Sequence, residues 1–155
     1  MAAAYCAIAL AAAWTVAFIL PVEPFEGLLP ILIGGGPGTW LLMGYLLYVS
    51  VGVAGFSAFS SLLTTLELQE GKTPDSRLMG AGLVLLFVGV TSSCLLLGFA
   101  GGLGGYSQSH VTGTSLTATL DPFLDVTRLT AAAAVAGAFF SVVGILRAKT
   151  ERLAE

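Results

Sequence analysis

The stretch from Leu78 to Leu103 reads LMGAGLVLLFVGVTSSCLLLGFAGGL and contains no charged residue. A transmembrane helix needs roughly 20 predominantly apolar residues to cross about 30 Å of hydrocarbon, so this stretch is long enough to span a bilayer. Residues 1–22, 27–66 and 129–146 also lack charge. Only 10% of the chain is charged, whereas soluble domains usually carry about 25% charged residues. The sequence therefore predicts an all-α membrane protein.

We expect one membrane domain over residues 1–155, a four-transmembrane-helix bundle with irregular outer loops. The predicted helices cover about 2–20, 40–66, 78–103 and 122–147. Pro30, Pro37 and the glycine run 34–36 argue against a regular helix over 27–38, and a second glycine-rich run, 101–105, should end the third helix. Asp121 followed by Pro122 has the chemistry of a helix start, an acceptor at the N-cap and then proline at the first helical position.

The first apolar segment has a second interpretation, a cleaved signal peptide. A signal peptide begins with a basic region, and none of the first 20 residues is Lys or Arg. We therefore expect a retained helix.

Basic residues predict the orientation of the bundle. Lys72 and Arg77 lie in the second loop, and Arg147, Lys149 and Arg152 lie in the C-terminal tail. With four spans these two regions share one side of the membrane, and cytoplasmic loops carry an excess of Lys and Arg. We therefore expect both termini in the cytoplasm and a multi-pass protein of the plasma membrane.

Small residues recur at helical spacing along three of the predicted spans. Without a hydrophobic force between helices in lipid, close approach over small residues holds transmembrane helices together. One interpretation is packing inside a single bundle. The other is docking of some faces onto partner subunits, because so small a bundle cannot bury every such face. The candidate packing residues are Ser50, Ala54, Ser57, Ala58 and Ser61 on the second helix, Gly82, Gly89 and Ser93 on the third, and Ala133, Gly137, Ser141 and Gly144 on the fourth.

Candidate chemical groups are few. No charged residue lies deep in a predicted span, which argues against an ion-coupled carrier. His110 is the only histidine, too few for a zinc or copper site of three or four ligands. Cys6 and Cys94 are expected to be buried, inert thiols. The net charge of −3 offers no basic surface for nucleic acid. We assign no catalytic, cofactor-binding or metal-binding residue.

The acidic residues of the outer loops are a further candidate. Glu23 and Glu26, together with Asp121 and Asp125, offer carboxylates of the kind that bind calcium or magnesium. Such residues are more often solvated or cap helices, and we take them as such.

The segment Gly36-Pro37-Gly38-Thr39-Trp40-Leu41-Leu42-Met43-Gly44-Tyr45 resembles small archaeal membrane proteins that accompany respiratory terminal oxidases of the heme-copper class. Val88-Gly89-Val90-Thr91, followed by residues 98–105, is similar to a second shared region. The histidines that hold the hemes and copper of the catalytic subunit have no counterpart in these spans. The resemblance therefore implies an accessory role.

Two classes of function remain. In the first, the chain is a noncatalytic, accessory subunit of an energy-converting membrane complex. A respiratory terminal oxidase is the first candidate for this complex, and a copper membrane monooxygenase is the alternative. Its partners are then other integral membrane subunits and lipids. In the second, it is a free-standing four-helix protein that binds lipid, quinone or another apolar ligand between its helices. Neither class makes the chain itself an enzyme, and we expect no cofactor on the isolated chain.

Overall fold

The computed structural model describes residues 1–20, 28–33, 35–110 and 116–150. It confirms an all-helical chain with four helices that are long and apolar enough to cross a membrane: Ala2–Ile19, Gly38–Leu68, Ser76–Gln108 and Leu120–Leu146. These four candidate spans indicate a multi-pass membrane protein. The bounds are α1 (Ala2–Ile19), α2 (Leu28–Ile33), α3 (Gly38–Leu47), the π-helix η1 (Tyr48–Ala54), α4 (Gly55–Glu70), α5 (Ser76–His110) and α6 (Leu116–Leu146).

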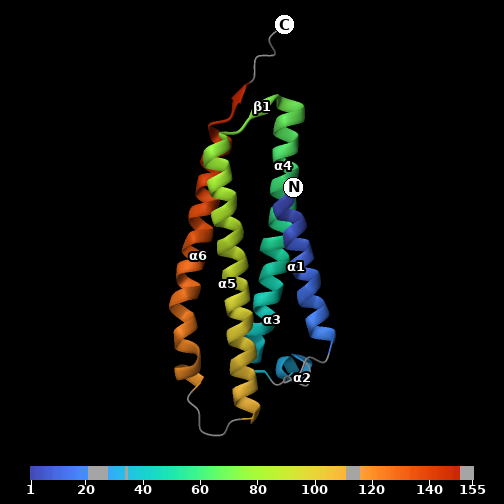
Figure 1. Cartoon of the computed structure of the whole chain (residues 1–155), viewed down its shortest axis with the longest axis vertical. Coiled ribbons are helices and arrows are strands. Elements are labelled where there is room, and N and C mark those ends of the chain that lie inside the picture. Colours follow the sequence, from blue (N-terminus) through green and yellow to red (C-terminus); the bar gives the residue numbers. More distant parts are fainter. Residues whose placement is uncertain (21–27, 34, 111–115, 151–155) are drawn as a thin grey trace.

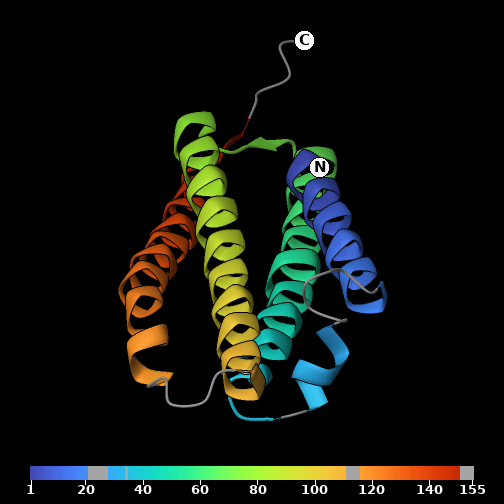
Figure 2. The same ribbon diagram turned by 60° about the horizontal axis from the view of Figure 1, so that its bottom comes forward.

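The helices lie on two sides of α5: α6 packs on one side, and α1 to α4 lie on the other. Figure 1 shows α5 and α6 side by side and antiparallel along most of their length. The half of α5 that ends at His110 packs against α3, while α1 lies against η1 and α4. Toward Glu70, α4 stands apart from α5 and α6 in both Figure 1 and Figure 2.

A short connection closes the end of the bundle where α4 and α6 end. Gly71 takes the left-handed conformation (φ 57°) that commonly ends a helix. Strand β1 (Lys72–Thr73) then pairs with β2 (Lys149–Thr150) in antiparallel fashion. Asp75 caps α5, since its Oδ1 accepts hydrogen bonds from the backbone N–H groups of Arg77 and Leu78 at 3.0 and 3.3 Å.

The third helix extends beyond its predicted end at Leu103. It continues through Gly101–Gly105 to His110, because α3 packs directly on these glycines. A side chain at Gly101 would meet the backbone of Leu41, and one at Gly105 would meet Ile31 and Gly38. Tertiary contact therefore offsets the weak helix propensity of glycine.

Two further predictions of local structure were wrong. The fourth helix begins at Leu116, so Pro122 lies inside α6 rather than at its first position. The longer α5 gives this extension a surface to pack on, since a side chain added at Gly104 would contact Leu120. Residues 28–33 form the short helix α2 although Pro30 lies within them. Proline is tolerated there because the N–H groups of a first helical turn have no intrahelical partner.

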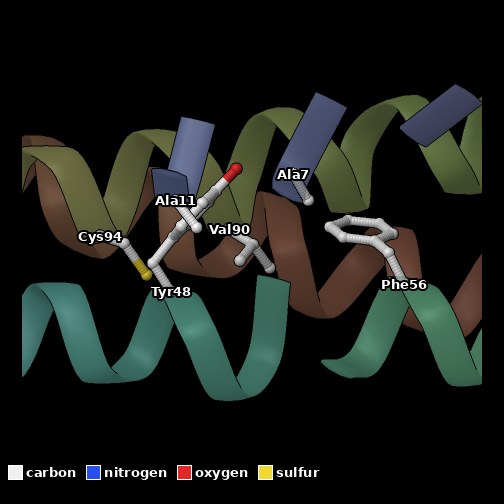
Figure 3. Close-up of a cluster of buried hydrophobic side chains, with 6 residues drawn as sticks. All are labelled: Ala7, Ala11, Tyr48, Phe56, Val90 and Cys94. Atoms are coloured by element: carbon white, nitrogen blue, oxygen red, sulfur yellow. The ribbon is translucent and has the colours of Figure 1, made fainter. Parts of the chain in front are cut away.

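A buried cluster joins α1, the second span and α5. It contains Ala7, Ala11, Tyr48, Phe56, Val90 and Cys94. Figure 3 shows the ring of Tyr48 reaching from the second span toward Ala11, with Cys94 beside it. Tyr48 has no exposed surface, and its ring lies against Gly52, where an added side chain would approach to 3.1 Å. This cluster holds α1 against the second span and α5.

Candidate functional site: an apolar groove between α1, α5 and α6

A groove of about 800 Å³ lies along α5, between α1 on one side and α6 on the other. Its lining is almost entirely apolar. A concave apolar surface at the depth of a membrane suits an apolar chain better than a polar substrate. The lining residues are Leu10, Trp14 and Ala17 of α1, Leu41 of α3, Ser92, Leu95, Leu96, Gly98, Phe99, Gly102 and Leu103 of α5, and Val126 and Thr130 of α6.

The wall on the α1 side depends on Gly98. A side chain at Gly98 would collide with the indole of Trp14, so the glycine allows Trp14 to lie across α5. The indole in turn packs edge-on against Tyr45, with ring centroids 5.9 Å apart. Thr15 and Tyr45 share a hydrogen bond of 2.8 Å between their hydroxyls. The aromatic contact and this bond join α1 to α3, which itself packs on α5.

Gly102 lies one turn further along α5 and, unlike Gly98, has open space beside it. It is buried and lines the groove, yet an added Cβ would meet nothing within 4 Å. The free space at Gly102 is therefore the space of the groove itself. Any side chain longer than that of glycine would occupy this space.

The hydroxyls that line the groove differ in their hydrogen bonding. Thr130 donates to a carbonyl of its own helix, Val126 at 3.1 Å or Thr127 at 3.0 Å, and accepts from Ser93 at 2.8 Å. Within the described part of the chain, the Ser92 hydroxyl makes no hydrogen bond, unlike Ser50, Ser61 and Ser141, which bond back to their own helix. Ser92 is thus a free donor on an apolar wall.

The small residues predicted on the third and fourth helices lie where α5 and α6 cross. A side chain at Gly82 would meet Ser141 and the carbonyl of Gly137. One at Gly89 would meet the backbone of Ala134, and one at Gly144 would meet Met79 at 3.2 Å. Ser93 reaches Thr130 across the same interface, and Ala133 is half-buried on α6.

The small residues predicted on the second helix lie elsewhere. Ser50, Ala54, Ala58 and Ser61 are exposed on η1 and α4, and Ser57 is half-buried. The Ser50 and Ser61 hydroxyls donate to Leu46 and Ser57 of the same helix. This set forms a small, smooth surface that α5 and α6 do not cover.

The remaining candidate groups are scattered. His110 is the last residue of α5, and its side chain lies outside the described residues, as do Glu23, Glu26 and Arg152. Among the residues that the structure describes, no three His, Cys, Asp or Glu come together as a metal site. Cys94 is buried, but Cys6 is exposed, contrary to expectation. Sequence reasoning missed the groove and its walls, because the collision that Gly98 avoids is with a residue 84 positions away.

No protein-family model, no curated protein and no solved structure matches this chain.

Proposed function

We propose that this chain is a noncatalytic subunit of a larger membrane complex, with its second span as the docking surface. The observation that carries the proposal is the separation of α4 from α5 and α6, although α4 lies against α1. The ring of Phe56 contacts Phe87 of α5, with centroids 5.5 Å apart, but toward Glu70 the helix leaves α5 and α6 (Figures 1 and 2). The surface left open carries Ala54, Ala58 and Ser61. Small residues are the ones over which transmembrane helices approach closely.

The proposed parent is an energy-converting complex, first a respiratory terminal oxidase of the heme-copper class. The support is the resemblance in segments 36–45, 88–91 and 98–105, of which the first and the last pack on one another here. A side chain at Gly44 would meet Cys94 and Gly98, and one at Gly101 would meet Leu41. The residues that resemble those of the oxidase-associated proteins thus lie at a contact between helices, as expected if this chain folds like those small subunits. A copper membrane monooxygenase is the alternative parent.

The test is migration of the native complex in a mild detergent, followed by mass spectrometry of the band. Ala54→Leu places a large side chain on the docking surface, and Ala138→Leu does the same at an exposed position of α6. We expect the chain to migrate with large, cofactor-bearing partners, and Ala54→Leu to release it while Ala138→Leu does not. Migration of the native chain without any other subunit would contradict the proposal.

The groove favours a second candidate function, the binding of an apolar ligand such as a lipid or a quinone. Its support is the apolar lining and the free hydroxyl of Ser92. Gly102→Leu would fill the groove, whereas Gly80→Leu adds the same side chain to a glycine of α5 that also faces open space. Extraction and mass spectrometry of the bound lipids and quinones is the measurement. A ligand that is retained by the Gly80 variant and lost from the Gly102 variant would support this function; equal retention would contradict it.

A further inference from the structure

The ion pair between Asp125 and Arg128 lies on the outward side of α6. Nη1 of Arg128 and Oδ1 of Asp125 are 3.1 Å apart. The side chain of Arg128 is 76% exposed and that of Asp125 is 88% exposed. The two residues are three apart on the same helix and contact each other.

The contacts of α6 give the level of this pair along α5. Thr130, two residues beyond Arg128, accepts the hydrogen bond from Ser93. Phe123, two residues before Asp125, lies edge-on to Phe99 with centroids 6.0 Å apart. The pair is therefore level with the part of α5 between Ser93 and Phe99. Ser93 is the middle residue of α5 (Ser76–His110).

The groove gives the level of the pair along α1. Val126, between the two residues of the pair, and Thr130, two residues beyond it, line the groove on α6. They lie opposite Leu10, Trp14 and Ala17 of α1. At 1.5 Å per residue, the 18 residues of α1 are about 27 Å long and take up most of a hydrocarbon core of about 30 Å. If α1 spans the bilayer, the ion pair lies inside the hydrocarbon.

Exposed charges at that depth are costly. Ionisable side chains within a membrane almost always face protein or a water-filled cavity and pair with other groups. The outward face around this pair, which we call the α6 face, continues with exposed residues at spacings of three and four. Its members are Asp121, Asp125, Arg128, Ala132, Val135 and Phe139. Lipid tails do not solvate the charged side chains of this face.

We propose that the α6 face is covered by the α6 face of a second copy of this chain. The argument is charge complementarity. A two-fold axis parallel to α6 brings each Asp125 near Arg128 of the other copy, because the two residues are three apart on one helix face. The two acids and two bases then form a closed, neutral set within protein. Such an interface is isologous, and the small side chain of Ala132 lets the two helices approach. This contact is independent of the proposed docking surface on α4.

Disulfide trapping tests the geometry on the purified full chain. Ala132→Cys is made in a Cys6→Ser, Cys94→Ala background, with Ala138→Cys as control. Both alanines are exposed on α6, but at 3.6 residues per turn they point about 120° apart. A disulfide needs Cα atoms within about 7 Å. We expect oxidation to yield a cross-linked dimer from Ala132→Cys and not from Ala138→Cys. Equal cross-linking at both positions, or none at Ala132→Cys, would overturn the proposal.

Charge reversal tests the pairing. Arg128→Asp leaves three acids and no base on each α6 face. It should weaken dimerisation about tenfold or more, since like charges across an interface cost several kcal/mol. The double variant Asp125→Arg, Arg128→Asp restores complementarity in a contact between identical copies, and dimerisation should return. Helical circular dichroism verifies that each variant is folded. A single variant that dimerises normally, or a folded double variant that stays monomeric, would contradict pairing between two copies.

Discussion

The hydroxyl of Ser93 on α5 donates a hydrogen bond of 2.8 Å to the hydroxyl of Thr130 on α6. Thr130 passes the bond on to a backbone carbonyl of its own helix, so both hydroxyls of this contact are paired. Gly89, one turn from Ser93, brings the backbones close at the same crossing. Together these contacts set the register of α5 against α6, on which the position of every residue of α6 depends.

Replacement of Gly137 by Leu should disrupt this crossing. A side chain there would collide with the backbone of Leu86 and lie 2.8 Å from the carbonyl oxygen of Gly82. We expect a loss of stability of about 3 kcal/mol, the upper part of the range for overpacking. Gly80→Leu is the control, because an added Cβ at Gly80 meets nothing within 4 Å. Unfolding in mixed micelles of increasing SDS fraction, followed by circular dichroism, gives the comparison. Equal stability of the two variants would mean that α5 and α6 do not pack at Gly137.

Replacement of Gly98 by Ala should displace Trp14. The added methyl group would overlap the indole, and moving the indole separates α1 from α5 at a cost of about 1 kcal/mol. Gly102→Ala, one turn away in open space, should change nothing. In a Trp40→Phe background the fluorescence of Trp14 reports its surroundings directly. We expect a shifted emission maximum for Gly98→Ala alone. A shift of equal size in Gly102→Ala would contradict the open space assigned to the groove at Gly102.

Removal of the cap of α5 should destabilise the end of the bundle that carries β1 and β2. Asp75→Ala leaves the N–H groups of Arg77 and Leu78 without their acceptor, and loss of an N-cap costs about 1 kcal/mol. Asp75→Asn keeps an acceptor oxygen and should be close to neutral. Hydrogen exchange of the amides of residues 76–79 is the measurement. Faster exchange is expected in the alanine variant and not in the asparagine variant, and unchanged exchange in both would rule out the cap.

The orientation of the bundle remains a prediction from its basic residues. Ser107 lies near the end of α5, and Lys149 lies in β2 at the other end of the bundle. With the β1–β2 end in the cytoplasm, as the excess of Lys and Arg there predicts, an impermeant thiol reagent outside the cell should label Ser107→Cys and not Lys149→Cys. Labelling of Lys149→Cys alone would reverse the orientation.

The groove and the packing surfaces could be predicted from the sequence only in part. Small residues at helical spacing predict surfaces over which helices can approach closely, but the spacing does not say which helix approaches. Gly82 and Ser141 lie against each other, whereas Ala54 and Ser61 are exposed. Gly98 and Gly102 are both glycines of α5, one turn apart. Only the position of Trp14 distinguishes them, because the indole lies against Gly98 and leaves open space at Gly102.

The sequence by itself determined that the chain forms four apolar helices. In a bilayer every backbone N–H and C=O must be paired within the protein, so long uncharged stretches become helices whatever their neighbours are. Only the tertiary structure decided that α5 continues to His110 and that α6 begins at Leu116, because the end of α5 packs on α3 and the start of α6 packs on the end of α5. It also decided that Asp125 and Arg128 lie level with the middle of α5, since that level comes from the stagger between helices and no local pattern of residues encodes it.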